Sequence, residues 1–251
     1  MPTIEENRQA WDKDWDDPGD SWSQAWGGVR SQWFGTILPR LQPFLPAATI
    51  LELGPGFGRW THFLREQCRH LVLVDLADKC IQACRRRFDG YSGISYYTND
   101  GKSLAMIPDR SISLVFSFDS LVHADADVVE AYISELARKL TPHGVGLIHH
   151  SNLGSYVSDS TGALAEGVTN QHWRSENMSA RLFEEYCENA GLQCIGQEVI
   201  NWGGEILNDC FSLFTPRDSP WKRPNRVVHN KRFMEEAARL RLISELYQTR
   251  R

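Results

Sequence analysis

Residues 49–58, with the sequence TILELGPGFG, constrain the fold more than any other part of the chain. An apolar run breaks into glycines at every second position, and Trp60, Phe63 and Leu64 follow at helical spacing. A strand, a glycine turn and a helix in this order are typical of a nucleotide site in an open α/β sheet. Glycine lets the backbone turn sharply and lets a ligand lie against bare main chain.

Two acidic residues near these glycines indicate which nucleotide the turn would bind. Glu52 lies two residues before Gly54, where a carboxylate suits a positively charged amino group and repels a pyrophosphate. Asp75 ends the next apolar run, 21 residues after Gly54, where a carboxylate can accept both ribose hydroxyls. Arg59 stands where the dinucleotide fingerprint has its third glycine. Together they describe S-adenosylmethionine; the alternative is a turn whose glycines are only structural.

Four motifs make the region from residue 50 to residue 152 resemble the class I S-adenosylmethionine-dependent methyltransferases. They are the glycine stretch with its ribose acid and the segments 98–101, 114–119 and 140–144. The resemblance implies an α/β fold, doubly wound, with a mostly parallel seven-stranded sheet, an antiparallel edge hairpin, an N-terminal helical cap and a C-terminal helix. It also implies cofactor contacts from Glu52, Gly54, Gly56, Gly58, Asp75, Leu76, Asp100, Gly101 and Asp119.

The chain divides into three regions. Residues 1–48 are a predicted N-terminal helical cap, and residues 49–216 are the predicted methyltransferase domain. Within that domain, residues 153–178 have little periodicity and several glycines, so we expect a cap loop on the acceptor side. Residues 217–251 form a basic C-terminal extension, with ten basic and four acidic residues in a chain of net charge −5.

Hydrophobic periodicity predicts strands that alternate with helices between residues 49 and 152, which argues for a parallel sheet. Two further strands, at 193–201 and 209–215, would form the antiparallel hairpin. The predicted helices cover residues 4–15, 28–38, 78–88, 126–140, 179–190 and 229–249.

Tryptophan is concentrated in the N-terminal cap, at positions 11, 15, 22, 26 and 33. Tryptophans this dense indicate buried packing on the sheet. The functional alternative is that Trp22, Trp26 or Trp33 forms a lid over the cofactor or a platform that stacks on a sugar ring.

The C-terminal helix carries Phe233, Ala237, Leu240 and Ile243 on one face. This apolar face needs a cover, either on its own domain or on another molecule. We expect it to pack on a second copy of the chain, which predicts a homo-oligomer; packing on its own domain is the alternative.

Composition fits a cytoplasmic protein without a membrane span. Net charge −5 gives no pull toward nucleic acid. No apolar stretch approaches the roughly 18 residues of a membrane span. The six cysteines form no C-x-x-C pair, and the acidic N-terminus lacks the apolar core of a signal peptide.

Reacting groups in such a sheet lie beyond the carboxyl ends of the strands. That rule selects Asp119 and His123 after the fourth strand, four residues apart. His123 is the predicted general base; it could instead only cap a helix or bind the cofactor. The pair also resembles part of a metal site in some O-methyltransferases, but Val122 replaces the middle glutamate, so a divalent metal is not favoured.

The fifth strand ends in two adjacent histidines, His149 and His150. Because neighbours on a strand point to opposite faces, only one can face the acceptor. We predict His150 as a second candidate base, with Asp119 as the third catalytic residue. The predicted acceptor contacts are His149, Asn152, His172 and Arg174.

These features predict O-methylation of a polar acceptor, a sugar or glycan hydroxyl. An aromatic or amine small molecule is the alternative acceptor, and a non-catalytic binding module is the rival from another class. A sugar acceptor predicts a wide, polar, open mouth, and a small aromatic acceptor predicts a closed apolar pocket.

Overall fold

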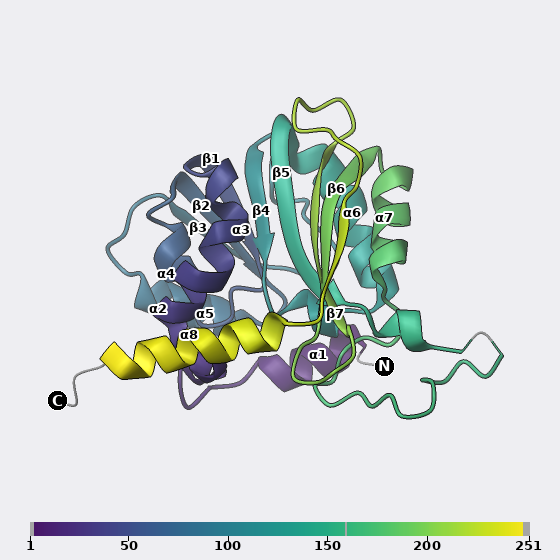
Figure 1. Ribbon diagram of the computed structural model, residues 1–251. Helices are drawn as coiled ribbons and strands as arrows, with labels where there is room; N and C mark the ends of the chain where they lie inside the picture. The colour runs from purple at the N-terminus through teal and green to yellow at the C-terminus, as the bar shows by residue number, and fades with distance from the viewer. Residues whose placement is uncertain (1–2, 159, 248–251) are drawn as a thin grey trace.

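The computed structural model describes residues 3–158 and 160–247, and its centre is a mixed eight-stranded sheet with helices on both faces (Figure 1). The strand order is β3-β2-β1-β4-β5-β7-β6-β8. The first five are parallel, and β7 runs antiparallel to both of its neighbours. The strands are β1 (Ala47–Leu53), β2 (Cys68–Asp75), β3 (Ile94–Thr98), β4 (Ile112–Ser117), β5 (Leu140–Ser151), β6 (Leu192–Ile200), β7 (Asp209–Pro216) and β8 (Val227–Asn230).

The helices lie close to their predicted positions. They are α1 (Ile4–Trp11), α2 (Val29–Gln32), α3 (Leu38–Leu41), α4 (Thr61–Leu64), α5 (Asp78–Arg87), α6 (Ala126–Lys139), α7 (Ala180–Asn189) and α8 (Phe233–Tyr247). A π-helical turn (Trp33–Ile37) joins α2 to α3, and 3₁₀ turns cover Asp20–Trp26, Gln42–Phe44, Leu121–His123 and Leu153–Tyr156. Among the described residues, no helix has the length and apolar character needed to cross a membrane.

The sheet is buried on both faces, as expected of parallel strands. Along β1, Leu51 and Leu53 point into a core shared with α6 and α7. Ile50 points into the other core, which holds α4, α5 and the buried tryptophans Trp26 and Trp33. We call the edge of the sheet that the carboxyl ends of β1, β2 and β4 form its open edge.

The predicted alternation of strands and helices is confirmed, but the predicted count of seven strands is wrong. Strand β8 adds an eighth by pairing in parallel with β6. It is only four residues long, and we had assigned its last two residues to the C-terminal helix. Pairing with β8 satisfies backbone groups that would otherwise stay open along the edge of β6. The division into three regions stays a prediction.

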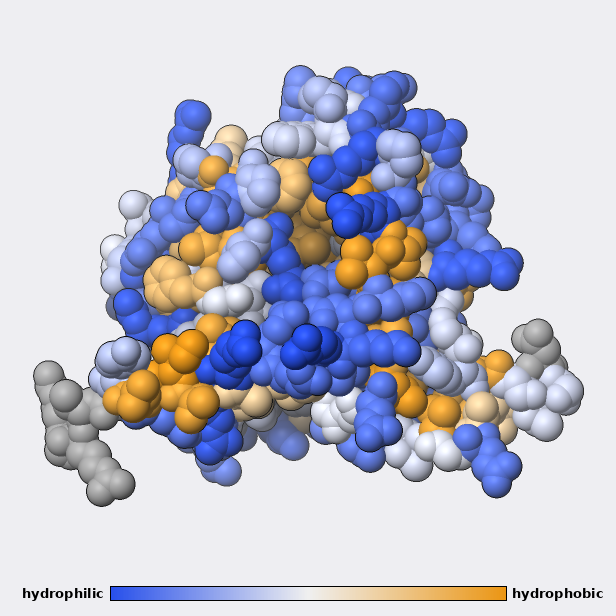
Figure 2. Space-filling view, in the orientation of Figure 1, coloured by the Kyte–Doolittle hydropathy of each residue, from blue (hydrophilic) through white to orange (hydrophobic). Residues whose placement is uncertain are grey.

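Helix α8 packs on its own domain, so the prediction that this face meets a second copy is wrong. Phe233 and Ala237 are buried in the core, and Leu240 lies against Gly35. Ile243, predicted on the packed face, is 49% exposed. Its neighbours Leu242, Leu246 and Tyr247 are exposed as well, and hydrophobic side chains gather at that end of the helix in Figure 2. A homo-oligomer stays a prediction, and residues 248–251 of the extension lie outside the described residues.

The packing of α8 predicts that substitutions on its two faces have very different effects on the free energy of unfolding. Phe233→Ala should lower the free energy of unfolding by about 3–5 kcal/mol, because Phe233 is 1% exposed and leaves a cavity. The matched surface change Leu246→Ser should stay within about 0.5 kcal/mol, because Leu246 is 73% exposed. Urea denaturation measures both values. Equal effects of the two changes would contradict this packing.

Candidate active site

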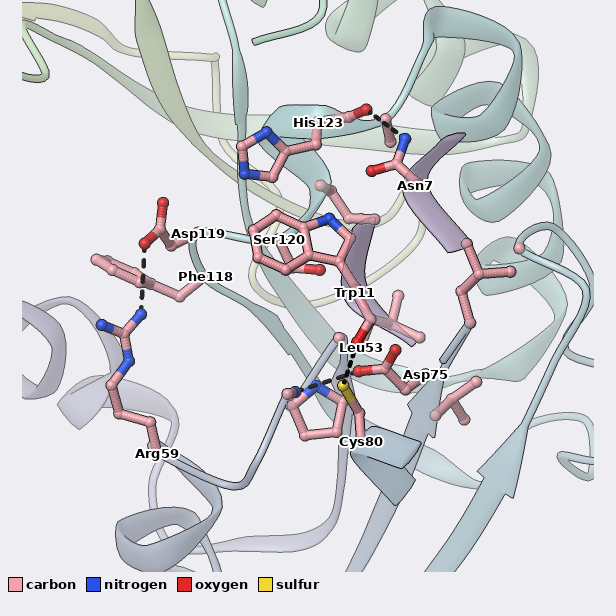
Figure 3. A pocket seen from close by; sticks show the side chains of 18 of the residues that line it. Asn7, Trp11, Leu53, Arg59, Asp75, Cys80, Phe118, Asp119, Ser120 and His123 are labelled. Atoms are coloured by element: carbon pink, nitrogen blue, oxygen red, sulfur yellow. Dashed lines mark hydrogen bonds and ion pairs between the residues drawn. The ribbon is translucent and has the colours of Figure 1, made fainter. Parts of the chain in front are cut away.

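A pocket lies at the carboxyl ends of β1, β2 and β4, between the sheet and the N-terminal segment (Figure 3). The sheet side contributes the glycine loop (residues 54–58), Asp75 and the tip of β4. The N-terminal side contributes α1 and the residues after it. Seven predicted site residues line the pocket: Gly54, Gly56, Asp75, Leu76, Gly101, Asp119 and His123.

The glycine loop has little room for side chains. Gly54 and Gly56 have φ angles of 68° and 56°, which favour glycine. A Cβ on Gly54 would lie 1.9 Å from Ser120 Oγ, and one on Gly56 would lie 2.7 Å from the Trp15 ring. Gly58 packs on Phe88, the residue that follows α5, and does not line the pocket; its cofactor contact stays a prediction.

Asp75 is the carboxylate of the pocket floor. Its oxygens accept hydrogen bonds from the backbone N–H groups of Gly56 at 3.1 Å and Ala77 at 2.9 Å. Burial raises its pKa to about 6, and these two backbone donors oppose that rise. A carboxylate has about four acceptor positions, so two remain for hydroxyl donors of a ligand.

Two predicted cofactor acids lie outside the pocket walls. Glu52 is buried under the glycine loop, where Thr61 Oγ1 donates to it at 2.6 Å. Its Oε1 has no hydrogen-bond partner among the described residues, and burial raises its pKa to about 8. Asp100 is exposed and accepts from the backbone N–H groups of Lys102 and Ser103. In the ligand-free protein Glu52 supports the loop and Asp100 shapes a turn, and their cofactor contacts stay predictions.

The pocket fits S-adenosylmethionine. Gly54 and Gly56 present bare main chain on the pocket wall, where an added Cβ would overlap Ser120 or Trp15. Asp75 would hold the ribose hydroxyls, and the apolar side chains of Leu76 and Val128 line the same pocket. Arg59 adds a buried guanidinium, which suits the carboxylate of the methionine part.

Three tryptophans close the pocket and form what we name the tryptophan lid: Trp11, Trp15 and Trp22. Trp15 stacks on Phe57 of the glycine loop, with ring centroids 4.3 Å apart and planes 3° apart. Asn7 of α1 donates to the His123 backbone carbonyl at 3.0 Å. Of the three tryptophans proposed as a lid, only Trp22 lines the pocket; Trp26 and Trp33 are core residues.

The lid leads to a prediction about cofactor release. Trp15→Ala should weaken S-adenosylmethionine binding about tenfold, mainly through faster dissociation, because it removes the ring that covers Gly56 and Phe57. Stopped-flow displacement would measure the dissociation rate. Trp221→Ala is the matched control, since Trp221 is 40% exposed and packs on Phe44 away from the pocket. Equal rates in both variants would argue against a lid.

His123 presents one ring nitrogen to the pocket. Its Nδ1 lies 2.9 Å from the backbone carbonyl of Trp173, which can only accept, so Nδ1 carries the proton. Nε2 therefore holds a lone pair. The ring packs between Trp11 and Trp173, with centroids 5.4 and 5.6 Å away. Burial, assisted by the Arg174 charge, lowers the pKa of His123 and keeps the imidazole neutral.

Asp119 places a carboxylate at the tip of β4. Its backbone has a positive φ of 57°. One oxygen lies 3.4 Å from Arg59 and the other 3.5 Å from Arg174. Around Asp119 and His123, as in all other described residues, no group of three His, Cys, Asp or Glu is arranged to hold a metal.

The two histidines of β5 point to opposite faces, as predicted. His149 faces the pocket side without lining it, and both its ring nitrogens are engaged by Asp209 and by the Asp119 backbone. His150 stacks on Phe183 and bonds Ser212 Oγ at 2.8 Å. Burial lowers the pKa of His150 to about 4. The prediction of His150 as a base is wrong, because its ring lies in the opposite core.

The remaining predicted acceptor residues have structural roles. Asn152 is buried and bonds the backbone of Leu207 and Ala180. His172 is exposed on the cap loop, next to Gly203. Arg174 is buried in an ion pair with Asp209 at 2.9 Å. None of the three lines the pocket.

Sequence reasoning missed several residues that line the pocket. Ile4, Asn7 and Trp11 come from α1, where a Thr3–Glu6 capping box marks a helix but not what it covers. Arg59 had attracted notice only as a departure from the dinucleotide fingerprint. Trp60, Phe118, Ser120 and Tyr132 gave no signal, since apolar and hydroxyl side chains look the same in a core and in a pocket wall.

Comparisons with known proteins match this chain to methyltransferases. Residues 50–144 match a family model described as a methyltransferase domain. Phosphoethanolamine N-methyltransferase 1 from Triticum aestivum is 28% identical over 152 residues, which cover 59% of this chain and 30% of that protein. Phosphoethanolamine N-methyltransferase 3 from Arabidopsis thaliana is 25% identical over 184 residues, covering 65% and 35%. An S-adenosylmethionine-dependent methyltransferase from Clostridium acetobutylicum superposes with a TM-score of 0.56 at 14% identity, covering 74% of this chain and 91% of that one.

These findings identify the kind of domain. Residues 50–144 match a methyltransferase domain, which agrees with the predicted methyl donor, S-adenosylmethionine. The solved structure supports the fold alone. The chain spans about a third of the length of the two curated relatives.

Proposed function

We propose that this S-adenosylmethionine-dependent methyltransferase methylates the nitrogen of a small amine acceptor that lies against Asp119. One observation carries the proposal: the Asp119 carboxylate lines a pocket whose walls are the aromatic rings of Trp22, Trp60 and Phe118. An ammonium group is attracted both by a carboxylate and by aromatic faces. The Arg59 guanidinium already uses these groups, 3.4 Å from Asp119 and 5.4 and 4.5 Å from the Trp22 and Trp60 rings, so the acceptor would replace one cation by another. The tryptophan lid adds the closed surroundings that a small acceptor needs.

The chain's own side chains have three roles in the reaction. When bound, S-adenosylmethionine supplies an electrophilic methyl group on its sulfonium. Asp119 would orient the acceptor, and His123 Nε2 would accept a proton from its ammonium group, which frees the nitrogen lone pair to form the N–C bond as the bond from the methyl carbon to sulfur breaks. The tryptophan lid would exclude water and hold the acceptor in an attacking geometry.

The names of the two curated relatives support an amine over a sugar. Both are named for N-methylation of phosphoethanolamine, whereas the sequence led us to a sugar or glycan hydroxyl. The rings of Trp11, Trp15 and Trp22 line the pocket, which supports a small acceptor over the wide polar mouth expected for a sugar. The alternative acceptor of the sequence analysis, an aromatic or amine small molecule, fits better.

A hydroxyl acceptor is the second candidate, and His123 is the observation that favours it. An alcohol must lose its proton as it attacks, so it depends on a base more than an amine does. The Nε2 lone pair of His123 can supply that base.

Matched acceptor pairs test the proposal. Ethanolamine and phosphoethanolamine would be compared with ethylene glycol and its phosphate, which replace only the nitrogen by oxygen. We expect kcat/KM at least tenfold higher for the amines, and a loss of about 10- to 100-fold for them in Asp119→Asn. Higher rates with the hydroxyl members, or with sugars, would favour the second candidate. Cofactor binding without turnover of any acceptor would point to a binding module.

A further inference from the structure

We infer that His149, Asp209 and Arg174 are positioning residues that fix the direction of the Asp119 carboxylate and thereby set acceptor affinity. The inference rests on the proposed role of Asp119. None of the three side chains lines the pocket, so none would touch the acceptor. We name the four residues together the Asp119 ring.

The Asp119 ring is a closed cycle of hydrogen bonds. The Asp119 backbone N–H donates to His149 Nδ1 at 3.1 Å, and His149 Nε2 lies 3.1 Å from Asp209 Oδ2. Arg174 donates two hydrogen bonds to the Asp209 carboxylate, from Nε at 3.2 Å and from Nη2 at 2.9 Å. The same Nη2 lies 3.5 Å from Asp119 Oδ1, which returns the cycle to its start. Backbone and carboxylate of Asp119 are thus held from two sides.

Hydrogen-bond chemistry leaves His149 a single tautomer. A backbone N–H can only donate, so Nδ1 must accept from Asp119. Nε2 then carries the proton and donates to Asp209. With both nitrogens engaged and no exposed surface, His149 is not available as a base for the acceptor.

The two carboxylates of the ring share one guanidinium within it, that of Arg174, and Arg59 supplies a second from outside, 3.4 Å from Asp119. Asp209 is buried, which raises its pKa, but Arg174 and the His149 hydrogen bond outweigh burial and hold the pKa at about 2. Arg174 is 3% exposed and also faces the Trp202 ring at 5.5 Å. An ion pair of this kind needs good geometry to offset the loss of water, which suits a rigid support.

Asp119 needs such a support because its backbone is strained. A φ of 57° is unusual for a residue other than glycine and costs of order 1–3 kcal/mol. The ring draws on β5, on the first residue of β7 and on the cap loop, three segments far apart in the sequence. Its geometry therefore links the cap loop to the direction of one pocket carboxylate.

A double-mutant cycle tests the inference. His149→Leu removes the bonds to Asp119 and Asp209 without leaving a new buried charge; it would be measured alone and combined with Asp119→Asn. We expect the acceptor KM to rise at least tenfold in His149→Leu, with S-adenosylmethionine affinity by calorimetry within threefold. In the Asp119→Asn background, His149→Leu should have no further effect on the acceptor KM. His149→Gln, whose amide can both accept and donate, should recover most of the loss.

His150→Leu is the matched control, because His150 is equally buried in the next position of β5 but faces the other core. It should lower the melting temperature without changing the acceptor KM. If His149→Leu does not fold, Arg174→Lys takes its place in the double-mutant cycle. Additive effects of His149→Leu and Asp119→Asn would overturn the inference, as would an unchanged KM in His149→Leu. If the proposed function is wrong, the result differs: Asp119→Asn alone leaves the acceptor KM unchanged. That result would overturn the proposed role of Asp119 and the inference that rests on it.

Discussion

Replacing His123 with alanine is expected to lower kcat by about 10²–10⁴ while S-adenosylmethionine affinity hardly changes. The reason is geometric: Nδ1 is committed to the Trp173 carbonyl, so the Nε2 lone pair faces a pocket that also holds the Asp119 carboxylate. Because burial lowers the pKa of His123, the acidic limb of the kcat profile should lie below about 6.5, the ordinary value for imidazole. Steady-state kinetics with the preferred acceptor would measure both.

His150→Gln is the control for this experiment. It removes the other candidate base of the sequence analysis, whose ring stacks on Phe183 and bonds Ser212 outside the pocket. Its kcat should stay within about threefold of the parent. Near-normal kcat in His123→Ala would remove the imidazole base from the mechanism.

Replacing Asp75 with alanine should weaken S-adenosylmethionine binding at least tenfold. The Asp75 carboxylate is the acceptor that the ribose hydroxyls would use, and such charge-assisted hydrogen bonds are worth roughly 1.5–3 kcal/mol each. Calorimetric titration measures the affinity, and Asp100→Ala is the matched control, because Asp100 is exposed and only caps a turn. Equal losses in the two variants would contradict the assignment of Asp75.

The raised pKa of Asp75 adds a pH dependence to that prediction. Hydroxyl donors favour the ionised carboxylate, so affinity should fall as the pH drops through about 6. The free energy of unfolding of the ligand-free protein should change with pH in the opposite sense. A folded-state pKa of about 6, against 3.8, means that the protonated form stabilises the ligand-free fold and that this stability is lost as pH rises from about 4 through 6. Asp75→Asn should therefore stabilise the ligand-free protein at pH 8 by up to about 3 kcal/mol, as urea denaturation would measure.

The nucleotide half was predictable because local chemistry dictates it. The glycines at 54 and 56 can be exchanged only at the cost of backbone strain and overlap with Ser120 and Trp15. Asp75 ends a strand whose register follows from its apolar run. The hydrophobic periodicity of the sequence was strong enough to place helices α5, α6 and α7 within a few residues.

The acceptor side was less predictable, because it is assembled from distant segments. Arg174 and Asp209 are far apart in the sequence, and only the antiparallel pairing of β5 with β7 brings Asp209 to His149. Period-two alternation correctly divided His149 from His150, but it could not say which face was the pocket. Tertiary packing decided that His150 belongs to the core beside Phe183.

The N-terminal segment shows a similar limit. Dense tryptophans were compatible with a core or with a lid, and the chain uses them for both. Trp26 and Trp33 fill the core on one face of the sheet, whereas Trp11, Trp15 and Trp22 close the pocket. Nothing in the local sequence separates the two sets, because the division depends on where α1 crosses the open edge of the sheet (Figure 1).

The most direct test of methyl transfer to an amine uses S-adenosylmethionine whose methyl group is labelled with carbon-13. The protein would be incubated with the matched acceptor pairs, and the product examined by NMR, because the carbon shift separates a methyl group on nitrogen from one on oxygen. We expect labelled N-methyl product from the amines, formed far more slowly by Asp119→Asn. Label that appears only on oxygen, or no labelled product with any acceptor, would contradict the proposed function.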